Sequence, residues 1–356
     1  MKPILFFIVS ALLYTHSFAQ NEQDQADAIL NDLVIQNKTV GASGGCSVNG
    51  EIAWLSAKGY ANKETKQPYT VDTKNRTASI AKPMTAIAIM QLVEQGRIDI
   101  QAPIQTYIPD YPKYKEGDIT IYHLLSHTSG LDSYQSNKER ETKKEYASLE
   151  AATTIFKDRE LRTAPGTAFH YTSYGYVLLG MIIENVSGLS YGEYIQTYIW
   201  DKAGMDNTGI VVYNNAPEGS TEIYHRHRKN KIKTAEENNL SNRIPAGGFY
   251  TTAEDLLKFG QAIIDNTLVS EETLNLMIQH HSLEKYANGY GLGWFLYGPR
   301  ENEGGLIGHS GAQTGVSSQL FIIPKRKMVF VILANTSGSW NDVIQSTANI
   351  IGVFNK

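Results

Sequence analysis

The sequence contains few of the residues that mark several special classes of protein. A single cysteine, Cys46, excludes an internal disulfide, and without cysteine or histidine neighbours it builds no metal site. We therefore expect Cys46 to be a small buried hydrophobic residue. The 11 prolines are too few for a collagen-like or low-complexity chain. With 32 Lys and Arg against 36 Asp and Glu, net charge gives no reason to expect a nucleic-acid partner.

Long apolar runs are also missing after the N-terminus. The first nineteen residues combine Lys2, an apolar stretch at 4–14 and the small-x-small tripeptide Ser-Phe-Ala at 17–19, which is the pattern of a secretory signal peptide. That apolar stretch is shorter than the roughly 20 residues that cross a bilayer. We therefore expect residues 1–19 to be removed and residues 20–356 to be secreted or periplasmic, with no stable membrane anchor.

The mature chain is globular in composition and long enough for a two-lobed body. Alternating runs on both sides of Asn49-Gly50 predict a hairpin near the N-terminus. Apolar runs at 315–323 and 327–335 predict two more strands near the C-terminus. Between these ends, residues 98–239 show only helical and loop-like patterns.

Strands at both ends of the chain with helices between them predict an α+β fold. One antiparallel sheet would be assembled from the two termini and flanked by helices, with an inserted helical lobe. We place the sheet-containing lobe at 20–78 and 240–356 and the helical lobe at 79–239. A last helix at about 340–353 would close the chain.

A serine and a lysine open the most apolar helix of the sequence. Ser79 and Lys82 are the ends of Ser-Ile-Ala-Lys, and the residues that follow are apolar nearly all round up to a glycine stop at Gly96, which is typical of a buried helix. Residues at i and i+3 lie on one helix face, so the two side chains can touch. A lysine can take the serine proton only if its pKa falls well below about 10.4, and burial lowers it. The alternative role for Ser79 is a simple N-cap.

Four other segments match functional patterns but lack the context. Ser-Leu-Glu-Lys at 282–285 is polar and no apolar helix follows it. Gly-Ala-Ser-Gly-Gly at 41–45 matches a nucleophile elbow, but a strand follows where a helix is needed, so we expect a glycine-rich bend. Glu-Glu-Thr-Leu-Asn at 271–275 is more typical of a helix start capped by Ser270. His-Arg-His-Arg-Lys at 225–229 lacks a third metal ligand and is expected to be a solvated basic loop.

Two later segments could complete an active site. Pro-Gly-Thr-Ala-Phe-His-Tyr-Thr-Ser at 165–173 leads into a second apolar helix, so Tyr171 and Ser173 lie where side chains project from a loop into a cleft. Gly-His-Ser-Gly-Ala at 308–312 begins a strand pair, which could present backbone N–H groups at a sheet edge. Taken alone, Tyr171 could be a packed aromatic residue and His309 an ordinary strand histidine.

Together and in this order, these elements resemble the serine beta-lactamase and penicillin-binding protein family, particularly the branch of class C beta-lactamases, D-aminopeptidases and esterases. The resemblance runs from about Gly41 to Asn335 and includes His-Leu-Leu-Ser-His-Thr-Ser-Gly-Leu at 123–131, Gly-Met-Ile-Ile-Glu at 180–184 and Ala-Gly-Gly at 246–248. It implies a beta-lactamase/transpeptidase-like fold and a serine hydrolase that forms an acyl-enzyme. No metal or organic cofactor is implied.

The resemblance also implies roles for the matching residues. Ser79 would be the acylated nucleophile, Lys82 the base that activates it, and Tyr171 a proton shuttle to the leaving group. The N–H of Ala312, just after Gly311, would form an oxyanion hole with the N–H of Ser79, and each such donor is worth roughly 3–4 kcal/mol.

Two departures from the family pattern concern substrate binding. Ser173 replaces the Asn of the family's Tyr-x-Asn motif and lacks the two amide donors. His309 replaces the first residue of Lys-Thr-Gly, whose lysine helps hold a substrate carboxylate. A histidine titrates near pH 6.5, so we expect an anchoring charge at His309 to be largely lost by pH 8.

We therefore expect an exported peptidase or esterase that acts on D-amino-acid peptides, amides or esters, including peptidoglycan-derived substrates. The missing lysine of Lys-Thr-Gly makes an efficient class C-like beta-lactamase the second choice. The alternative from a different class of function is a penicillin-binding sensor or scaffold that is acylated without turnover.

Overall fold

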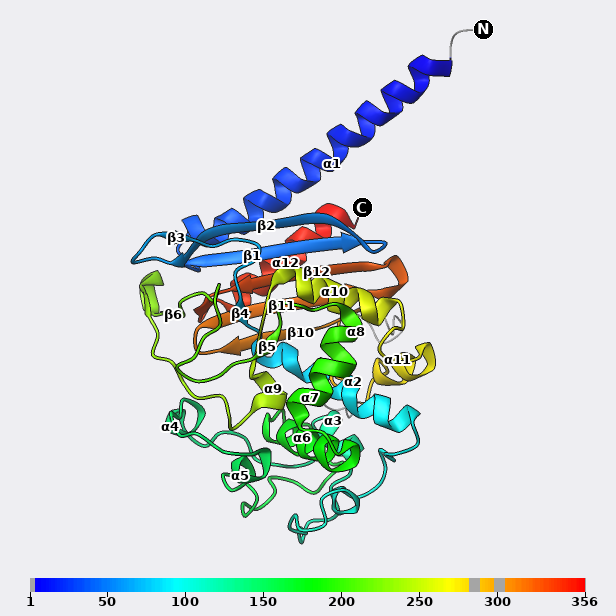
Figure 1. Cartoon of the computed structure of the whole chain (residues 1–356), viewed down its shortest axis with the longest axis vertical. Helices are drawn as coiled ribbons and strands as arrows, with labels where there is room; N and C mark the ends of the chain where they lie inside the picture. Colours follow the sequence, from blue (N-terminus) through cyan, green and yellow to red (C-terminus); the bar gives the residue numbers. More distant parts are fainter. Residues whose placement is uncertain (1–3, 282–288, 298–304, 356) are drawn as a thin grey trace.

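A computed structural model describes residues 4–281, 289–297 and 305–355 (Figure 1). Its main element is a seven-stranded sheet in the order β3-β2-β1-β12-β11-β10-β9, in which neighbouring strands are antiparallel. The N-terminal strands β1 (Gly41–Val48) and β2 (Glu51–Asn62) join the C-terminal strands through the β1–β12 pair. The prediction of one antiparallel sheet built from both termini is confirmed.

The predicted hairpin near the N-terminus is also confirmed. Val48 pairs with Glu51, which leaves a two-residue loop, and both loop residues have positive φ, 54° at Asn49 and 86° at Gly50. Two positive φ angles define the turn type that matches the twist of the flanking strands. The local sequence therefore determines this turn.

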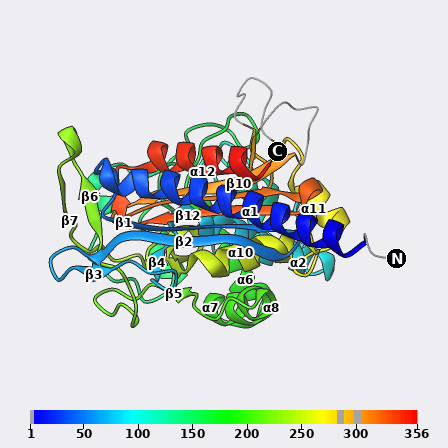
Figure 2. The same ribbon diagram turned by 90° about the horizontal axis from the view of Figure 1, so that it is seen from above.

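Helices cover both faces of the sheet (Figures 1 and 2). On one face, α1 (Ile4–Ile35) and α12 (Trp340–Phe354) form an apolar core with β11 (Val316–Ile323) and β12 (Met328–Ala334). On the other face, α10 (Ala253–Ile264) buries the apolar stripe that includes Leu256 and Phe259, and the larger core continues from there into the helical lobe.

The centre of the helical lobe is α2 (Ala81–Glu94), which packs against α6 (Tyr174–Ser187) and the short α9 (Ile244–Gly247). Helix α2 is apolar nearly all round and buried along most of its length, as predicted, and Gly96 follows its end with φ +67°. A helix without a polar face is stable only inside a core. The start of α2 is thereby held between the sheet and the lobe.

Smaller elements complete the chain. The remaining helices are α3 (Ile121–Leu125), α4 (Asn137–Arg140), α5 (Leu149–Thr153), α7 (Tyr191–Ile195), α8 (Asp201–Ala203) and α11 (Glu271–Met277), with short turns η1 (Ala78–Ile80), η2 (Ile104–Thr106), η3 (Gln196–Trp200), η4 (Arg228–Asn230) and η6 (Pro324–Arg326). The remaining strands are β3 (Gln67–Pro68), β4 (Asn75–Arg76), β5 (Gly209–Ile210), β6 (Tyr224–Arg226), β7 (Ile232–Thr234), β8 (Phe249–Thr251), β9 (Phe295–Tyr297), β10 (Leu306–Gln313) and β13 (Thr336–Ser337).

Two expectations about local structure are wrong. Residues 41–45 form part of β1 rather than a bend, because they pair with β2 on one side and β12 on the other. A Cβ on Gly44 would lie 2.8 Å from Trp54, and one on Gly45 would lie 2.8 Å from Leu257. The glycines thus make room for packing across the sheet. Strands β5, β6 and β7 lie within 98–239, where only helices and loops were expected, because two or three residues are too few to show a period of two.

The basic segment 225–229 is only partly a solvated loop. His225 and Arg226 belong to β6, where the His225 ring bonds to Ser337 and Arg226 pairs with Asp342 at 2.7 Å. The residues from His227 to Lys229 are exposed. Strand β6 forms because β13, more than a hundred residues away, supplies its neighbour.

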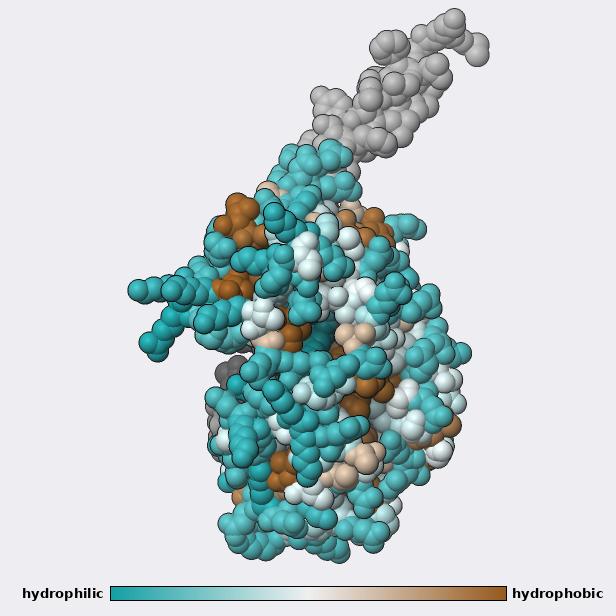
Figure 3. Space-filling model, turned by 60° about the vertical axis from the view of Figure 1, so that its left-hand side comes forward, coloured by the Kyte–Doolittle hydropathy of each residue, from teal (hydrophilic) through white to brown (hydrophobic). Residues whose placement is uncertain are grey.

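Helix α1 runs across the predicted cleavage position and extends beyond the body (Figure 1). Among the described residues, no helix combines the length and apolar character that crossing a membrane requires. The face in Figure 3 is largely hydrophilic, with hydrophobic residues in small separate groups. Cys46 is fully buried, as expected, and burial raises the pKa of its thiol to about 12.

Candidate active site

Ser79 lies in the turn η1, directly before α2, and its side chain is half-buried. The preceding residue, Ala78, has φ +49°, a conformation that residues with a Cβ rarely adopt. The turn is held from two sides, because Thr77 donates its N–H to the carbonyl of Phe249 at 2.8 Å and accepts a hydrogen bond from Ser318 Oγ at 2.8 Å. The backbone at Ser79 is therefore fixed by β8 and β11.

Lys82 is fully buried one turn along the helix from Ser79. Its Nζ lies 3.2 Å from Ser79 Oγ, 3.4 Å from Ser173 Oγ and 2.9 Å from the carbonyl oxygen of Ala246. Burial, assisted by the positive charge of Arg243, holds the pKa of Lys82 well below its usual value. A neutral amine can accept a proton from Ser79 while still donating to the Ala246 carbonyl.

Tyr171 lies beside this pair and is half-buried, with its ring centroid 4.9 Å from Lys82 Nζ. Burial raises the pKa of Tyr171, and a hydrogen bond with Ser79 opposes that rise without cancelling it. The phenol therefore remains protonated near neutral pH and acts as a donor. Of the two groups beside Ser79, Lys82 is the one suited to be the base.

His309 occupies an environment that excludes the predicted anchoring charge. The side chain is 1% exposed, its Nδ1 donates to the carbonyl of Ser310 at 2.7 Å, and its Nε2 accepts from the hydroxyl of Tyr290 at 3.2 Å. Burial and the nearby Lys82 lower the pKa of His309 to about 3. The expectation that His309 is charged at pH 6 is therefore wrong, because tertiary packing removes the water that a charged imidazole needs.

A kinetic experiment checks this correction. The measured quantity is the ratio of KM for a carboxylated ester to KM for a neutral ester of similar size. Because His309 stays neutral, its titration should change this ratio by less than about twofold between pH 6 and pH 8. Steady-state kinetics at several pH values, with His309→Gln as control, measure the ratio. A severalfold rise that His309→Gln removes would show that the histidine carries a charge.

The strand β10 brings Gly311 and Ala312 to the same site. A Cβ on Gly311 would lie 2.3 Å from the carbonyl oxygen of Thr77, so only glycine allows β10 to approach the turn at Ser79 this closely. In the part of the chain that the structure describes, β9 pairs with β10 only from Leu306 to Gly308, and Ala312 is exposed. Exposure of Ala312 among the described residues is compatible with the predicted role of its N–H.

Sequence reasoning assigned no role to three neighbours of the site. His127 is buried with φ +58°, and its ring centroid lies 4.3 Å from that of Tyr171. Tyr290 holds His309, and Ala246 supplies the carbonyl that binds Lys82. His127 and Ala246 lie in motifs that carry the family resemblance, which is the only signal that could have found them. Nothing in the sequence marks Tyr290.

Two other segments with functional patterns lie within the described residues, and neither forms a similar site. Ser43 is buried in β1, between Ala57 and Leu333 on the neighbouring strands. Residues 282–285 lie outside the described residues. Ser270 caps α11 by accepting a hydrogen bond from the Thr273 N–H at 3.2 Å, which confirms the capped helix start. Among the described residues, no group of three or more His, Cys, Asp or Glu side chains is placed to hold a metal ion.

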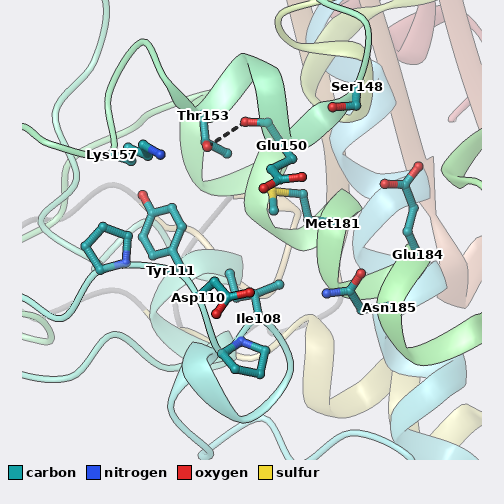
Figure 4. A pocket seen from close by; sticks show the side chains of 12 residues that line it. Ile108, Asp110, Tyr111, Ser148, Glu150, Thr153, Lys157, Met181, Glu184 and Asn185 are labelled. Carbon is teal, nitrogen blue, oxygen red and sulfur yellow. Dashed lines mark hydrogen bonds between the residues drawn. The ribbon is translucent and has the colours of Figure 1, made fainter.

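A cavity of about 350 Å³ opens elsewhere in the helical lobe (Figure 4). Asp110, Glu150, Met181 and Glu184 are among its lining residues, and none of the predicted site residues lines it. Met181 and Glu184 belong to the C-terminal half of α6. The predicted chemistry lies at the other end of this helix, where Ser173 precedes its first turn.

Comparisons with known proteins point to one family and one fold. A model of the Beta-lactamase family matches residues 19–351. "Protein flp" of Staphylococcus aureus (strain MRSA252) is 29% identical over 328 residues, which cover 90% of this chain and 64% of that protein. This chain thus spans somewhat less than two thirds of the length of that relative.

Two solved structures are similar over almost their whole length. The penicillin binding protein from Bacillus halodurans has a TM-score of 0.79 and 26% sequence identity, covering 90% of this chain and 99% of that chain. The D-amino acid amidase from Ochrobactrum anthropi SV3 has a TM-score of 0.81 and 23% identity, covering 94% and 99% of the two chains. These similarities confirm the predicted fold.

Proposed function

The chain belongs to the Beta-lactamase family of serine hydrolases, and we propose that it is an exported peptidase or esterase that forms an acyl-enzyme on Ser79. The observation that carries this proposal is the environment of Lys82. A fully buried amine with a lowered pKa lies 3.2 Å from a half-buried serine hydroxyl. This arrangement activates a nucleophile at neutral pH.

The proposed mechanism gives each group the role that the family resemblance implies. Ser79 Oγ attacks the substrate carbonyl carbon while Lys82 Nζ takes its proton. The N–H groups of Ser79 and Ala312 stabilise the oxyanion that forms. When the intermediate collapses, the leaving amine or alcohol takes a proton from Tyr171, which recovers it from Lys82. Water then hydrolyses the acyl ester and restores the Ser79 hydroxyl.

The proposed preference for D-amino-acid substrates over beta-lactams rests on His309, which replaces the lysine of Lys-Thr-Gly. Because His309 is neutral, no cation stands at that position to hold a beta-lactam carboxylate. D-amino-acid peptides, amides and esters do not depend on that charge, and the D-amino acid amidase from Ochrobactrum anthropi has the same fold. Small molecules and peptides, including peptidoglycan-derived ones, are therefore the proposed substrates.

Export is proposed on the pattern of the first nineteen residues. Lys2, the apolar stretch at 4–14 and the tripeptide at 17–19 have the order and lengths of a signal peptide. The mature protein would be secreted or periplasmic, where peptidoglycan-derived substrates occur. The expected result is a secreted or periplasmic form whose N-terminus is Gln20, which N-terminal sequencing detects.

The rival functions are separated by turnover. With p-nitrophenyl acetate we expect a burst of p-nitrophenolate followed by steady release, because Ser79 is acylated and water then removes the acyl group. Release that stopped after one equivalent would support an acylated sensor or scaffold instead. Parallel assays with nitrocefin and D-amino-acid amides distinguish a class C-like beta-lactamase, which would hydrolyse nitrocefin faster, from the proposed amidase.

A further inference from the structure

Arg243 is a buried cation without a counter-charge. Its side chain is among the buried ones, at 3% exposure, and its Nη2 donates to the carbonyl oxygen of Arg140 at 2.6 Å, but its Nε has no hydrogen-bond partner among the described residues. By contrast, another buried arginine, Arg76, pairs with Glu237 at 2.8 Å. No carboxylate of the described residues forms such a pair with Arg243. An unpaired buried charge destabilises the fold, which indicates that an anion from outside the chain binds to Arg243.

A second unpartnered donor lies beside this arginine. The hydroxyl of Tyr134 is buried without a hydrogen-bond partner among the described residues, and the Tyr134 ring centroid is 5.1 Å from Arg243 Cζ. A guanidinium and a phenol can both donate to one carboxylate, which has two acceptor oxygens. The two orphaned donors thus share one chemical preference.

Both residues lie next to the catalytic groups. Arg243 immediately precedes α9, which supplies the Ala246 carbonyl that binds Lys82, and its positive charge reaches Lys82. The Tyr134 ring packs edge-on against Tyr174 with centroids 5.1 Å apart. Tyr174 directly follows Ser173, whose Oγ lies 3.4 Å from Lys82 Nζ. The donors therefore lie at the Ser173 side of the site, between α6 and α9.

We propose that Arg243 and Tyr134 form a subsite for a carboxylate of the substrate, next to the carbonyl that Ser79 attacks. This inference rests on the proposed hydrolase function. Among the proposed peptide, amide and ester substrates, it favours those that also carry a free carboxylate. It also moves anion recognition from His309, which is neutral, to Arg243.

The test compares p-nitrophenyl glutarate, which has a free carboxylate, with its methyl ester, which has none. In the unaltered enzyme we expect the higher kcat/KM for the carboxylate. Arg243→Gln should lower the ratio of the two kcat/KM values by at least about tenfold, mainly through KM, because a hydrogen-bonded charge is lost. Any effect of Arg243 on Lys82 acts on both substrates and cancels in the ratio.

Arg140→Gln is the matched control. It removes one positive charge from the residue whose carbonyl Arg243 contacts, and it keeps that carbonyl. The Arg140 side chain binds Glu141 and is half exposed. The ratio should stay within about twofold of the unaltered value. An equal fall of the ratio in both variants would overturn the subsite, because the overall positive charge of the region would then explain the preference for the carboxylate.

Tyr134→Phe provides a second variant if Arg243→Gln does not fold, as judged by thermal unfolding and fluorophosphonate labelling. Loss of the hydroxyl alone should lower the ratio at least about threefold. The subsite is overturned if the ratio is unchanged in folded Arg243→Gln. If that variant is unfolded, an unchanged ratio in Tyr134→Phe overturns it. Either result leaves the proposed hydrolase function standing. Failure of the unaltered enzyme to hydrolyse either ester would overturn the proposed function itself.

Discussion

Ser79→Ala is expected to abolish covalent labelling by a fluorophosphonate and to lower ester turnover by about 10⁴-fold or more. The nucleophile is lost, and no other described serine combines a half-buried hydroxyl at the start of a buried helix with a lysine one turn along. Mass spectrometry of the labelled protein and p-nitrophenyl acetate kinetics measure the two effects. Labelling that persisted in Ser79→Ala would contradict the mechanism.

Ser173 provides the most demanding control for this prediction. Its Oγ lies 3.4 Å from Lys82 Nζ, only slightly farther than that of Ser79, so the lysine could in principle activate either hydroxyl. Ser173→Ala should retain the label, because the proposed oxyanion donors include the N–H of Ser79 and not that of Ser173. Ser43→Ala and Ser282→Ala should also retain it, and loss of the label in Ser173→Ala alone would make Ser173 the nucleophile.

Lys82→Arg is expected to slow acylation by at least about two orders of magnitude. Arginine keeps the positive charge and roughly the length of lysine but cannot lose its proton near neutral pH, so it cannot accept the proton of Ser79. Burial lowers the pKa of Lys82 well below its usual value, which favours the neutral amine that this step needs. Stopped-flow measurement of the burst rate reports acylation directly.

The same variant needs a check on its fold, because Lys82 has no exposed surface and arginine is bulkier. Lys82→Ala supplies the comparison, since it removes both the base and the volume. Equal rates in the two variants, with unchanged circular dichroism, would identify proton acceptance as the lost function. A rate near that of the unaltered enzyme in Lys82→Arg would mean that Lys82 acts only through its charge.

Local features of this protein follow from short stretches of sequence. The Asn49-Gly50 turn needs two positive φ angles, which these residues tolerate, and the i, i+3 spacing brings Ser79 and Lys82 together on any helix. The apolar character of α2 required its burial and hence a lowered lysine pKa. Sequence motifs alone also placed Tyr171 and Ser173 beside this pair.

Contacts between distant segments decided the rest. His309 is neutral because Tyr290 and the surrounding core remove its water, and Arg243 is unpaired because no carboxylate of the described residues lies within ion-pair distance of it. Residues 41–45 form a strand because β2 and β12 pair with them, and their glycines leave room for Trp54 and Leu257. The sequence by itself determined which groups could react, and only the tertiary structure decided their charge states, because a pKa depends on water and neighbours that the fold assembles.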